Sequence, residues 1–197
     1  ALQQAPFSAS AAANLLAEGT RSMSAHEVAE QLDYYGSWYD VNIDRDYAYI
    51  NFATLSKFFD RTLAVAEEIL LRPTFPEEEL RTYAAKRKQR LAIDRTKVDV
   101  EAREAFARAL FGARHPYGIS SDEAEYDRLT RDDVADFYRR FYTAENCFVV
   151  CSGRIGEHEL QAVGALAAQL PHGEAETAIR FPAPETTHAA FVDHPGA

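Results

Sequence analysis

The chain has little cysteine: only Cys147 and Cys151 occur among its 197 residues. Both lie in one apolar run, and in a strand their four-residue spacing puts the two side chains on one face about 13 Å apart, at a rise of roughly 3.3 Å per residue. That separation is too long for a disulfide bond. We therefore predict two buried free thiols, which indicate nothing about the cellular compartment.

Long hydrophobic runs are also lacking. No apolar stretch approaches the roughly 20 residues that a membrane-spanning helix needs. Hydrophobic residues nevertheless make up 47% of the chain and aromatic residues 12%, which is enough for a packed core. At this length one compact, soluble domain is the default expectation, with the bacterial periplasm and the cytoplasm both compatible.

Basic residues are scarce relative to acidic ones, 21 against 31, so the formal net charge is −10. This charge repels nucleic acid and anionic lipid at long range. The basic residues between positions 81 and 97 crowd one predicted helix, but acidic residues flank them. We interpret that stretch as a solvated helix face and expect no nucleic-acid partner.

Histidine pairs with the spacing of a zinc site are missing as well. His26 and His115 are interpreted as structural, because one lies in the first turn of a predicted helix and the other in a His-Pro turn. The side chains of Glu157, His158 and Glu159 point about 100° apart on a helix, so they cannot all face one metal ion. The remaining histidines are His172, His188 and His194.

The segments that are present alternate between helical and extended patterns. Two extended stretches, 37–42 and 47–55, are rich in aromatic and β-branched residues and predict a β-hairpin around Asp44-Arg45-Asp46. A further apolar strand is predicted at 146–153. Helices are predicted at 8–20 (ending at Gly19), within 21–36 (with Ser24 and Glu27 as a capping box), and at 56–72, 74–95, 98–111, 130–142 (opened by Thr130 with Asp133) and 157–170. This mixture indicates an α+β fold, mostly antiparallel sheet with helices packed on one face.

The composition changes near the end of the chain. From Pro171 to Thr187 there are three prolines and scattered polar residues, which is typical of a linker. A strand pattern follows at 188–192. We therefore assign residues 1–170 to one α+β domain, 171–187 to a linker and 188–197 to the start of a second, truncated domain.

The order and spacing of several short sequence motifs resemble those of a known protein family. Ser8 to Thr20 reads SASAAANLLAEGT, and it is followed by Arg45-Asp46 in the hairpin, a leucine-arginine-proline stretch at 70–73 and His115-Pro116-Tyr117-Gly118. The chain resembles the peptidase M16 family, which includes insulinase, pitrilysin and mitochondrial processing peptidase. The resemblance covers nearly the whole chain, although the family's first strands have no counterpart here.

Active members of that family carry a His-x-x-Glu-His zinc motif shortly before the Gly-Thr pair. Counted back from Gly19-Thr20, the two histidines correspond to Ser10 and Asn14, and the catalytic glutamate to Ala13. The family's third zinc ligand, a glutamate on the long helix, corresponds to Leu91 by counts from both sides, and an accessory acid to Ala84. None of these residues replaces the group it displaces, so the resemblance implies no catalytic residues and no zinc cofactor.

Two residues on the predicted strand after Gly36 also differ from those of active family members. Active members have Asn-Ala there, on an edge strand that holds the substrate backbone by strand addition. This chain has Asp40-Val41. Because strand addition uses backbone groups, we keep Asp40 and Val41 as candidate peptide-binding residues.

The resemblance implies a non-catalytic homologue that pairs with an active M16 peptidase subunit, or with a second half of the same polypeptide, to form a peptide-binding chamber. One alternative is a scaffold or assembly subunit without a peptide role. A second alternative is an active zinc metalloendopeptidase with rearranged ligands.

Overall fold

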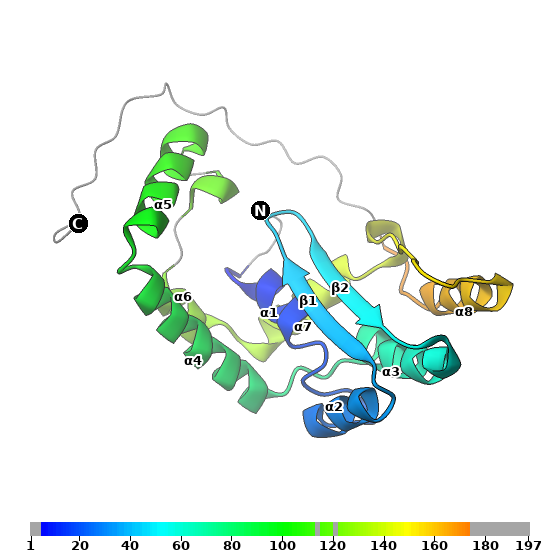
Figure 1. Ribbon diagram of the computed structural model, residues 1–197. Helices are drawn as coiled ribbons and strands as arrows, with labels where there is room; N and C mark the ends of the chain where they lie inside the picture. The colour runs from blue at the N-terminus through cyan, green and yellow to red at the C-terminus, as the bar shows by residue number, and fades with distance from the viewer. Residues whose placement is uncertain (1–4, 113–114, 120–121, 174–197) are drawn as a thin grey trace.

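The computed structural model describes residues 5–112, 115–119 and 122–173. Two antiparallel strands and a set of helices form the α+β arrangement that the sequence predicts (Figure 1). The helices are α1 (Ser8–Asn14), α2 (Ala25–Tyr34), η1 (Ser56–Phe58), α3 (Phe59–Leu71), α4 (Glu77–Asp94), α5 (Val98–Phe111), η2 (Pro116–Gly118), α6 (Glu123–Arg128), α7 (Arg131–Phe141), η3 (Ala144–Asn146) and α8 (Glu157–Ala167).

Side-chain caps fix where several helices begin. The Ser24 hydroxyl accepts a hydrogen bond from the backbone N–H of Glu27, and the Glu27 carboxylate accepts one from the backbone N–H of Ser24. Thr130 and Asp133 form the same reciprocal pair at the start of α7. Each pair satisfies backbone donors that the first helical turn leaves without partners. The predicted beginnings of α2 and α7 are confirmed.

The hairpin is also confirmed. Its strands are β1 (Trp38–Ile43) and β2 (Ala48–Ala53), paired antiparallel with Tyr39 opposite Phe52 and Val41 opposite Ile50. At the turn, the Asp44 carboxylate accepts hydrogen bonds from two backbone N–H groups, of Asp46 and Tyr47, both at 2.7 Å. This local bonding explains why an Asp-Arg-Asp sequence closes the hairpin without glycine.

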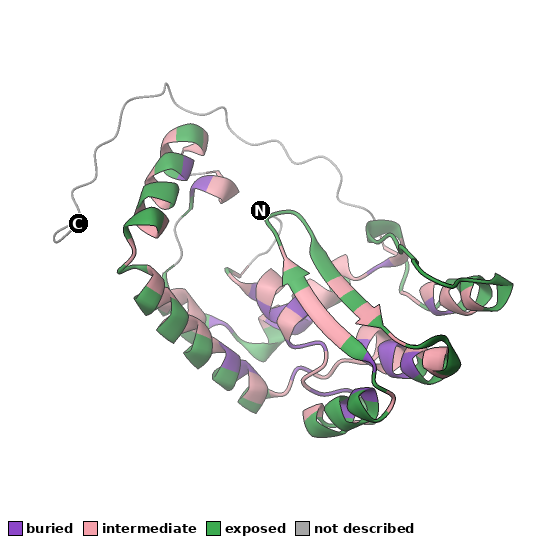
Figure 2. Cartoon of the chain, in the orientation of Figure 1, coloured by how far each residue is buried: buried purple, intermediate pink, exposed green. Residues whose placement is uncertain are grey.

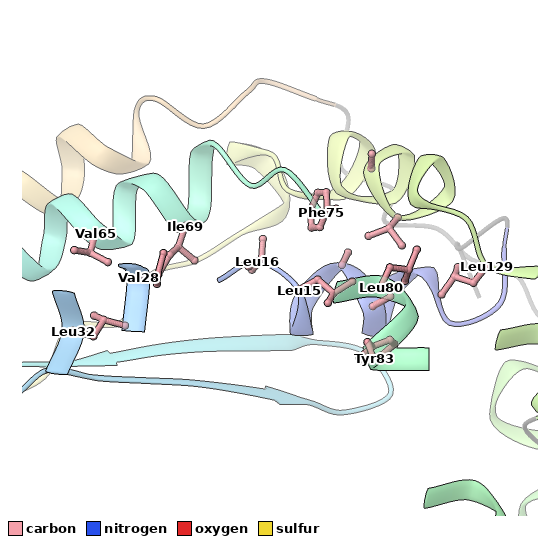
Figure 3. Close-up of a cluster of buried hydrophobic side chains, with 14 residues drawn as sticks. Leu15, Leu16, Val28, Leu32, Val65, Ile69, Phe75, Leu80, Tyr83 and Leu129 are labelled. Carbon is pink, nitrogen blue, oxygen red and sulfur yellow. The ribbon is translucent and has the colours of Figure 1, made fainter. Parts of the chain in front are cut away.

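The hydrophobic core lies where α1 meets α2, α3, α7 and the start of α4. Figure 3 shows Leu15 and Leu16, which directly follow α1, in the middle of this cluster, with Ile69 on one side and Leu80 on the other. Leu16 and Ile69 are fully buried. Exposed residues cover the outer faces of α2, α4, α5 and α8, the hairpin tip and the segment before α8 (Figure 2). The core therefore positions α1 and the first turns of α4 against each other.

The first helix is shorter than predicted. It ends at Asn14, and Gly19 does not cap it in the left-handed conformation: its φ is 152°, and its backbone forms an isolated bridge with Ser24. A Cβ at Gly19 would lie 2.9 Å from Cγ of Pro76. The glycine is required by this close approach to the start of α4, which the sequence pattern did not reveal.

The predicted strand at 146–153 is wrong. Residues 147–152 are extended but form no strand within the described ranges, and Phe148, Val149 and Val150 are 70%, 55% and 79% exposed. The two thiols predicted to be buried, Cys147 and Cys151, are exposed. A strand needs a hydrogen-bonded neighbour, and no other described segment pairs with this one. Of the predicted linker, only 171–173 are described, and the predicted second domain at 188–197 lies outside the described residues.

Candidate functional site

The motif positions on α1 carry short polar or small side chains. Ser10 and Asn14 lie one helical turn apart on a common face, as predicted, and the side-chain amide of Asn14 donates to the carbonyl of Ser10 at 2.7 Å. The Ser10 hydroxyl donates to the carbonyl of Phe7 at 3.1 Å. Ala13 is fully buried. Ser10 and Asn14 therefore remain partly accessible, whereas Ala13 acts in packing.

Two side chains of α4 reach these positions. The hydroxyl of Tyr83 donates to Oγ of Ser10 at 3.0 Å, and Nη2 of Arg87 donates to Oδ1 of Asn14 at 3.3 Å. The Arg87 guanidinium also lies over the Tyr83 ring, 5.2 Å from its centroid. Tyr83 and Arg87 are four residues apart, so one face of α4 meets one face of α1. We call Ser10, Asn14, Tyr83 and Arg87 the α1–α4 polar cluster.

Sequence counting missed the two α4 members of this cluster. It pointed to Leu91, which lies on the same stripe of α4 one turn beyond Arg87, and to Ala84, next to Tyr83. Neither Leu91 nor Ala84 makes a polar contact with α1. The i, i+4 spacing shared by Ser10–Asn14 and Tyr83–Arg87 is the signal that could have identified the pairing.

An aromatic pair borders the polar cluster. The rings of Phe7 and Tyr126 stack at 3.9 Å with a 2° angle between their planes. Burial raises the pKa of the Tyr126 phenol to about 12, with a further rise from Tyr83 and an opposing effect of the Arg87 cation. Tyr126 therefore stays neutral at physiological pH, and the cation beside it is Arg87.

A second group of charges surrounds Glu18, which lies in the segment after α1. Burial raises the pKa of the Glu18 carboxyl; the nearby Glu79 carboxylate raises it further and the Lys86 cation lowers it. Glu18 in turn contributes, after burial, to the raised pKa of Tyr39 on β1. The Glu18 carboxylate therefore interacts electrostatically both with Tyr39 of β1 and with Glu79 and Lys86 of α4.

Three comparisons with known proteins bear on this site. Residues 128–196 match the family model described as "Peptidase M16 inactive domain". A protein of Rickettsia bellii described as an "Uncharacterized zinc protease" is 24% identical over 160 residues, which is 80% of this chain and 39% of the relative. A crystal structure of a peptidase M16 inactive domain from Pseudomonas fluorescens superposes with a TM-score of 0.85 at 23% identity, over 91% of this chain and 45% of that one. Together these comparisons support the resemblance to the peptidase M16 family.

A second solved structure with a similar fold is that of a protease from Helicobacter pylori, with a TM-score of 0.69 and 17% identity over 90% of this chain and 44% of that one. The chain spans less than half the length of each of these relatives. The model that matches its C-terminal third is that of an inactive domain, which supports a non-catalytic M16 homologue. No helix among the described residues combines the length and apolarity needed to span a membrane.

Zinc does not fit the M16 motif positions of this chain. Protein zinc ligands are cysteine, histidine and carboxylate side chains, whereas the positions here hold Ser10, Ala13, Asn14 and Leu91. The group that α4 brings to Asn14 is the Arg87 guanidinium, which is always protonated and repels a divalent cation. Elsewhere in the described ranges, no group of three or more histidine, cysteine or acidic residues is arranged to hold a metal ion.

The histidines in the described residues have other partners. Nδ1 of His115 accepts from the backbone N–H of Tyr117, which shapes the His-Pro turn. His158 pairs with Asp60 at 2.7 Å and His172 with Glu145 at 2.6 Å, both at exposed positions. The Glu157–Glu159 stretch begins α8, where the Glu159 carboxylate accepts from the backbone N–H of Gly156 at 2.8 Å. These contacts give the histidines structural roles.

The candidate peptide-binding strand has a free edge. Within the described residues β1 pairs only with β2, so its other edge has backbone groups available for an added strand. In Figure 1 this free edge is on the side of α4 and α5. Asp40 pairs with Asn51 and Val41 with Ile50, and their side chains point to opposite faces of the sheet. Their assignment as peptide contacts remains a prediction.

Proposed function

We propose that this chain is a non-catalytic M16 homologue that pairs with an active M16 peptidase subunit, or with a second half of its own polypeptide, and supplies one wall of a peptide-binding chamber. The observation that carries the proposal is the α1–α4 polar cluster. Where active members hold zinc between these two helices, this chain joins them by two hydrogen bonds, Tyr83 to Ser10 and Arg87 to Asn14.

This arrangement supports a structural role for the former site. The two hydrogen bonds connect residues that are 73 positions apart in the chain. They hold α1 against α4 without a metal ion, so the domain keeps its shape after the loss of the ligands. A protein can share the fold of an enzyme without having the enzyme's active site. The free edge of β1 needs only backbone groups to receive an extended peptide, and it is retained.

The test is reconstitution. The purified chain is assayed for zinc by elemental analysis and for hydrolysis of a quenched-fluorescence peptide, alone and with a motif-bearing M16 peptidase from the same genome. We expect less than about 0.1 zinc per chain, no chelator-sensitive hydrolysis by the chain alone, and a 1:1 complex whose hydrolysis exceeds that of the peptidase alone. About one zinc per chain, with chelator-sensitive activity of the chain alone, would contradict the proposal.

The scaffold alternative has one observation in its favour. The exposed apolar run Phe148–Val150 is a surface that a protein partner could cover. Stable recovery of the chain in a large complex without any motif-bearing peptidase, and without a gain in hydrolysis on mixing with one, would favour that alternative over the peptide chamber.

A further inference from the structure

The Arg87 guanidinium differs in its partners from three arginines that follow it in the sequence. Arg90, Arg95 and Arg103 each lie within 3.2 Å of a carboxylate oxygen at exposed positions. Arg87 is partly buried, and among the described residues its contacts are the neutral Asn14 amide oxygen and the Tyr83 ring. In a chain with 31 acidic residues, this cation is held in place without a carboxylate partner.

A fixed guanidinium is suited to one class of ligand. It presents five N–H donors in a planar fork, and a carboxylate accepts two of them in parallel. One Nη2 hydrogen bond goes to Asn14 at 3.3 Å, which leaves the other donors for a ligand. The contact with the Tyr83 ring restrains the Arg87 guanidinium, so the side chain loses little conformational freedom when an anion binds.

We propose that Arg87, held between Tyr83 and Asn14, binds a carboxylate of an extended peptide that lies along the free edge of β1. The inference rests on the proposed function, because it assigns a peptide feature to the chamber wall. The carboxylate is either the peptide's C-terminal group or an aspartate or glutamate side chain. In this proposal the Arg87 guanidinium binds an anion at the place where active M16 members bind a metal cation.

The location of Arg87 relative to β1 supports this assignment. Arg87 donates to Asn14 of α1, and α1 in turn contacts β1, so the strand and this face of α4 are joined through α1. Asp40 on β1 disfavours acidic residues directly beside the strand by like-charge repulsion. A bound peptide therefore gains most when its carboxylate lies beyond the strand, at Arg87.

Three N-acetylated octapeptides of alternating valine and threonine test the proposal by calorimetric titration of the 197-residue chain: a free acid, a C-terminal amide, and an amide with its last threonine replaced by glutamate. We expect the free acid, the glutamate peptide or both to bind about tenfold more tightly than the plain amide, as a bidentate charged pair gives. The identity of the tighter peptide distinguishes a terminal carboxylate from a side-chain one.

The variants are Arg87→Gln, Arg87→Lys and, as the matched control, Arg81→Gln, which removes an exposed arginine of the same helix. Arg87→Gln is expected to abolish the preference for the carboxylate while leaving the binding of the plain amide unchanged. Arg87→Lys should restore part of the preference, and Arg81→Gln all of it. Circular dichroism shows that each variant is folded.

The outcomes separate this inference from the proposed function. Equal binding of all three peptides, unchanged by Arg87→Gln, overturns the role of Arg87 and leaves peptide binding intact. Binding of none of them overturns the peptide chamber. In that case the Arg87 Nε–H resonance is followed during an acetate titration, with the Arg81 resonance as internal control. A shift confined to Arg87 supports an anion site, and no shift overturns it.

Discussion

Two apolar segments of the chain, the Leu15-Leu16 pair after α1 and the segment 147–152, differ in burial. Leu15 and Leu16 are 2% and 0% exposed at the centre of the core, whereas Val150 is 79% exposed. The turn after α1 that holds Leu15 and Leu16 bonds its backbone locally: the N–H of Leu15 donates to the carbonyl of Ala11, and the carbonyl of Leu15 accepts from the N–H of Glu18. An extended segment needs a hydrogen-bonded neighbour before its side chains can be covered. The difference shows that hydrophobicity predicts burial only where backbone bonding is already satisfied.

The largest expected effect on the free energy of unfolding comes from a substitution in the buried segment. Leu16→Ala removes a fully buried side chain between Ile69 and Phe75 in the core cluster. We expect it to lower the free energy of unfolding by about 3 kcal/mol, from lost burial and the cavity left behind. Urea denaturation followed by circular dichroism measures this. A loss below about 1 kcal/mol would mean that α1 is not central to the core.

A smaller effect is expected at the polar contact of the same helix. Tyr83→Phe removes the hydrogen bond to Oγ of Ser10, and we expect a loss of about 1 kcal/mol. A double-mutant cycle with Ser10→Ala isolates the pair from other effects of each substitution. A coupling energy indistinguishable from zero would remove this bond as a connection between α1 and α4.

The sequence predicted most of the helices and the hairpin because their signals are local. Ser24 with Glu27, Thr130 with Asp133 and the proline at 73 mark helix ends through bonds or restrictions within a few residues. The family and the α+β class followed from the order of these pieces. The Tyr83–Ser10 and Arg87–Asn14 pairs could not be predicted, because they depend on which face of α4 meets α1 and on 73 intervening residues. The strand at 146–153 failed for the same reason: its structure depends on a distant partner.

Glu18, in the segment after α1, provides a pH-dependent test of the buried side. Its pKa is raised above the ordinary value of 4.5, by burial first and then by Glu79. The unfolded chain therefore loses this proton at lower pH than the folded chain, so the contribution of Glu18 to stability falls as pH rises through 4.5 and above. Glu18→Gln should raise the free energy of unfolding at pH 7 by less than about 1 kcal/mol, because partial exposure screens the charge.

The measurement for Glu18→Gln is the melting temperature of both proteins between pH 3.5 and pH 7. The stabilisation by the variant should be absent at pH 3.5, where the carboxyl is protonated in both states, and should grow to a plateau towards neutral pH. A gain that is constant across this range would show that the substitution acts through packing and not through ionisation.

The smallest expected effect tests the exposed side of the comparison. Val150→Ala removes two methyl groups from a side chain that is 79% exposed, and we expect the free energy of unfolding to change by less than about 0.5 kcal/mol. The matched substitution Val65→Ala removes the same groups from a side chain that is 6% exposed on α3, and it should cost about 2 kcal/mol. Urea denaturation at two protein concentrations measures both variants. If Val150→Ala costs as much as Val65→Ala at high concentration only, another copy of the chain covers 147–152. If it costs as much at both concentrations, the segment is buried within the chain, and exposure no longer distinguishes it from the Leu15-Leu16 pair.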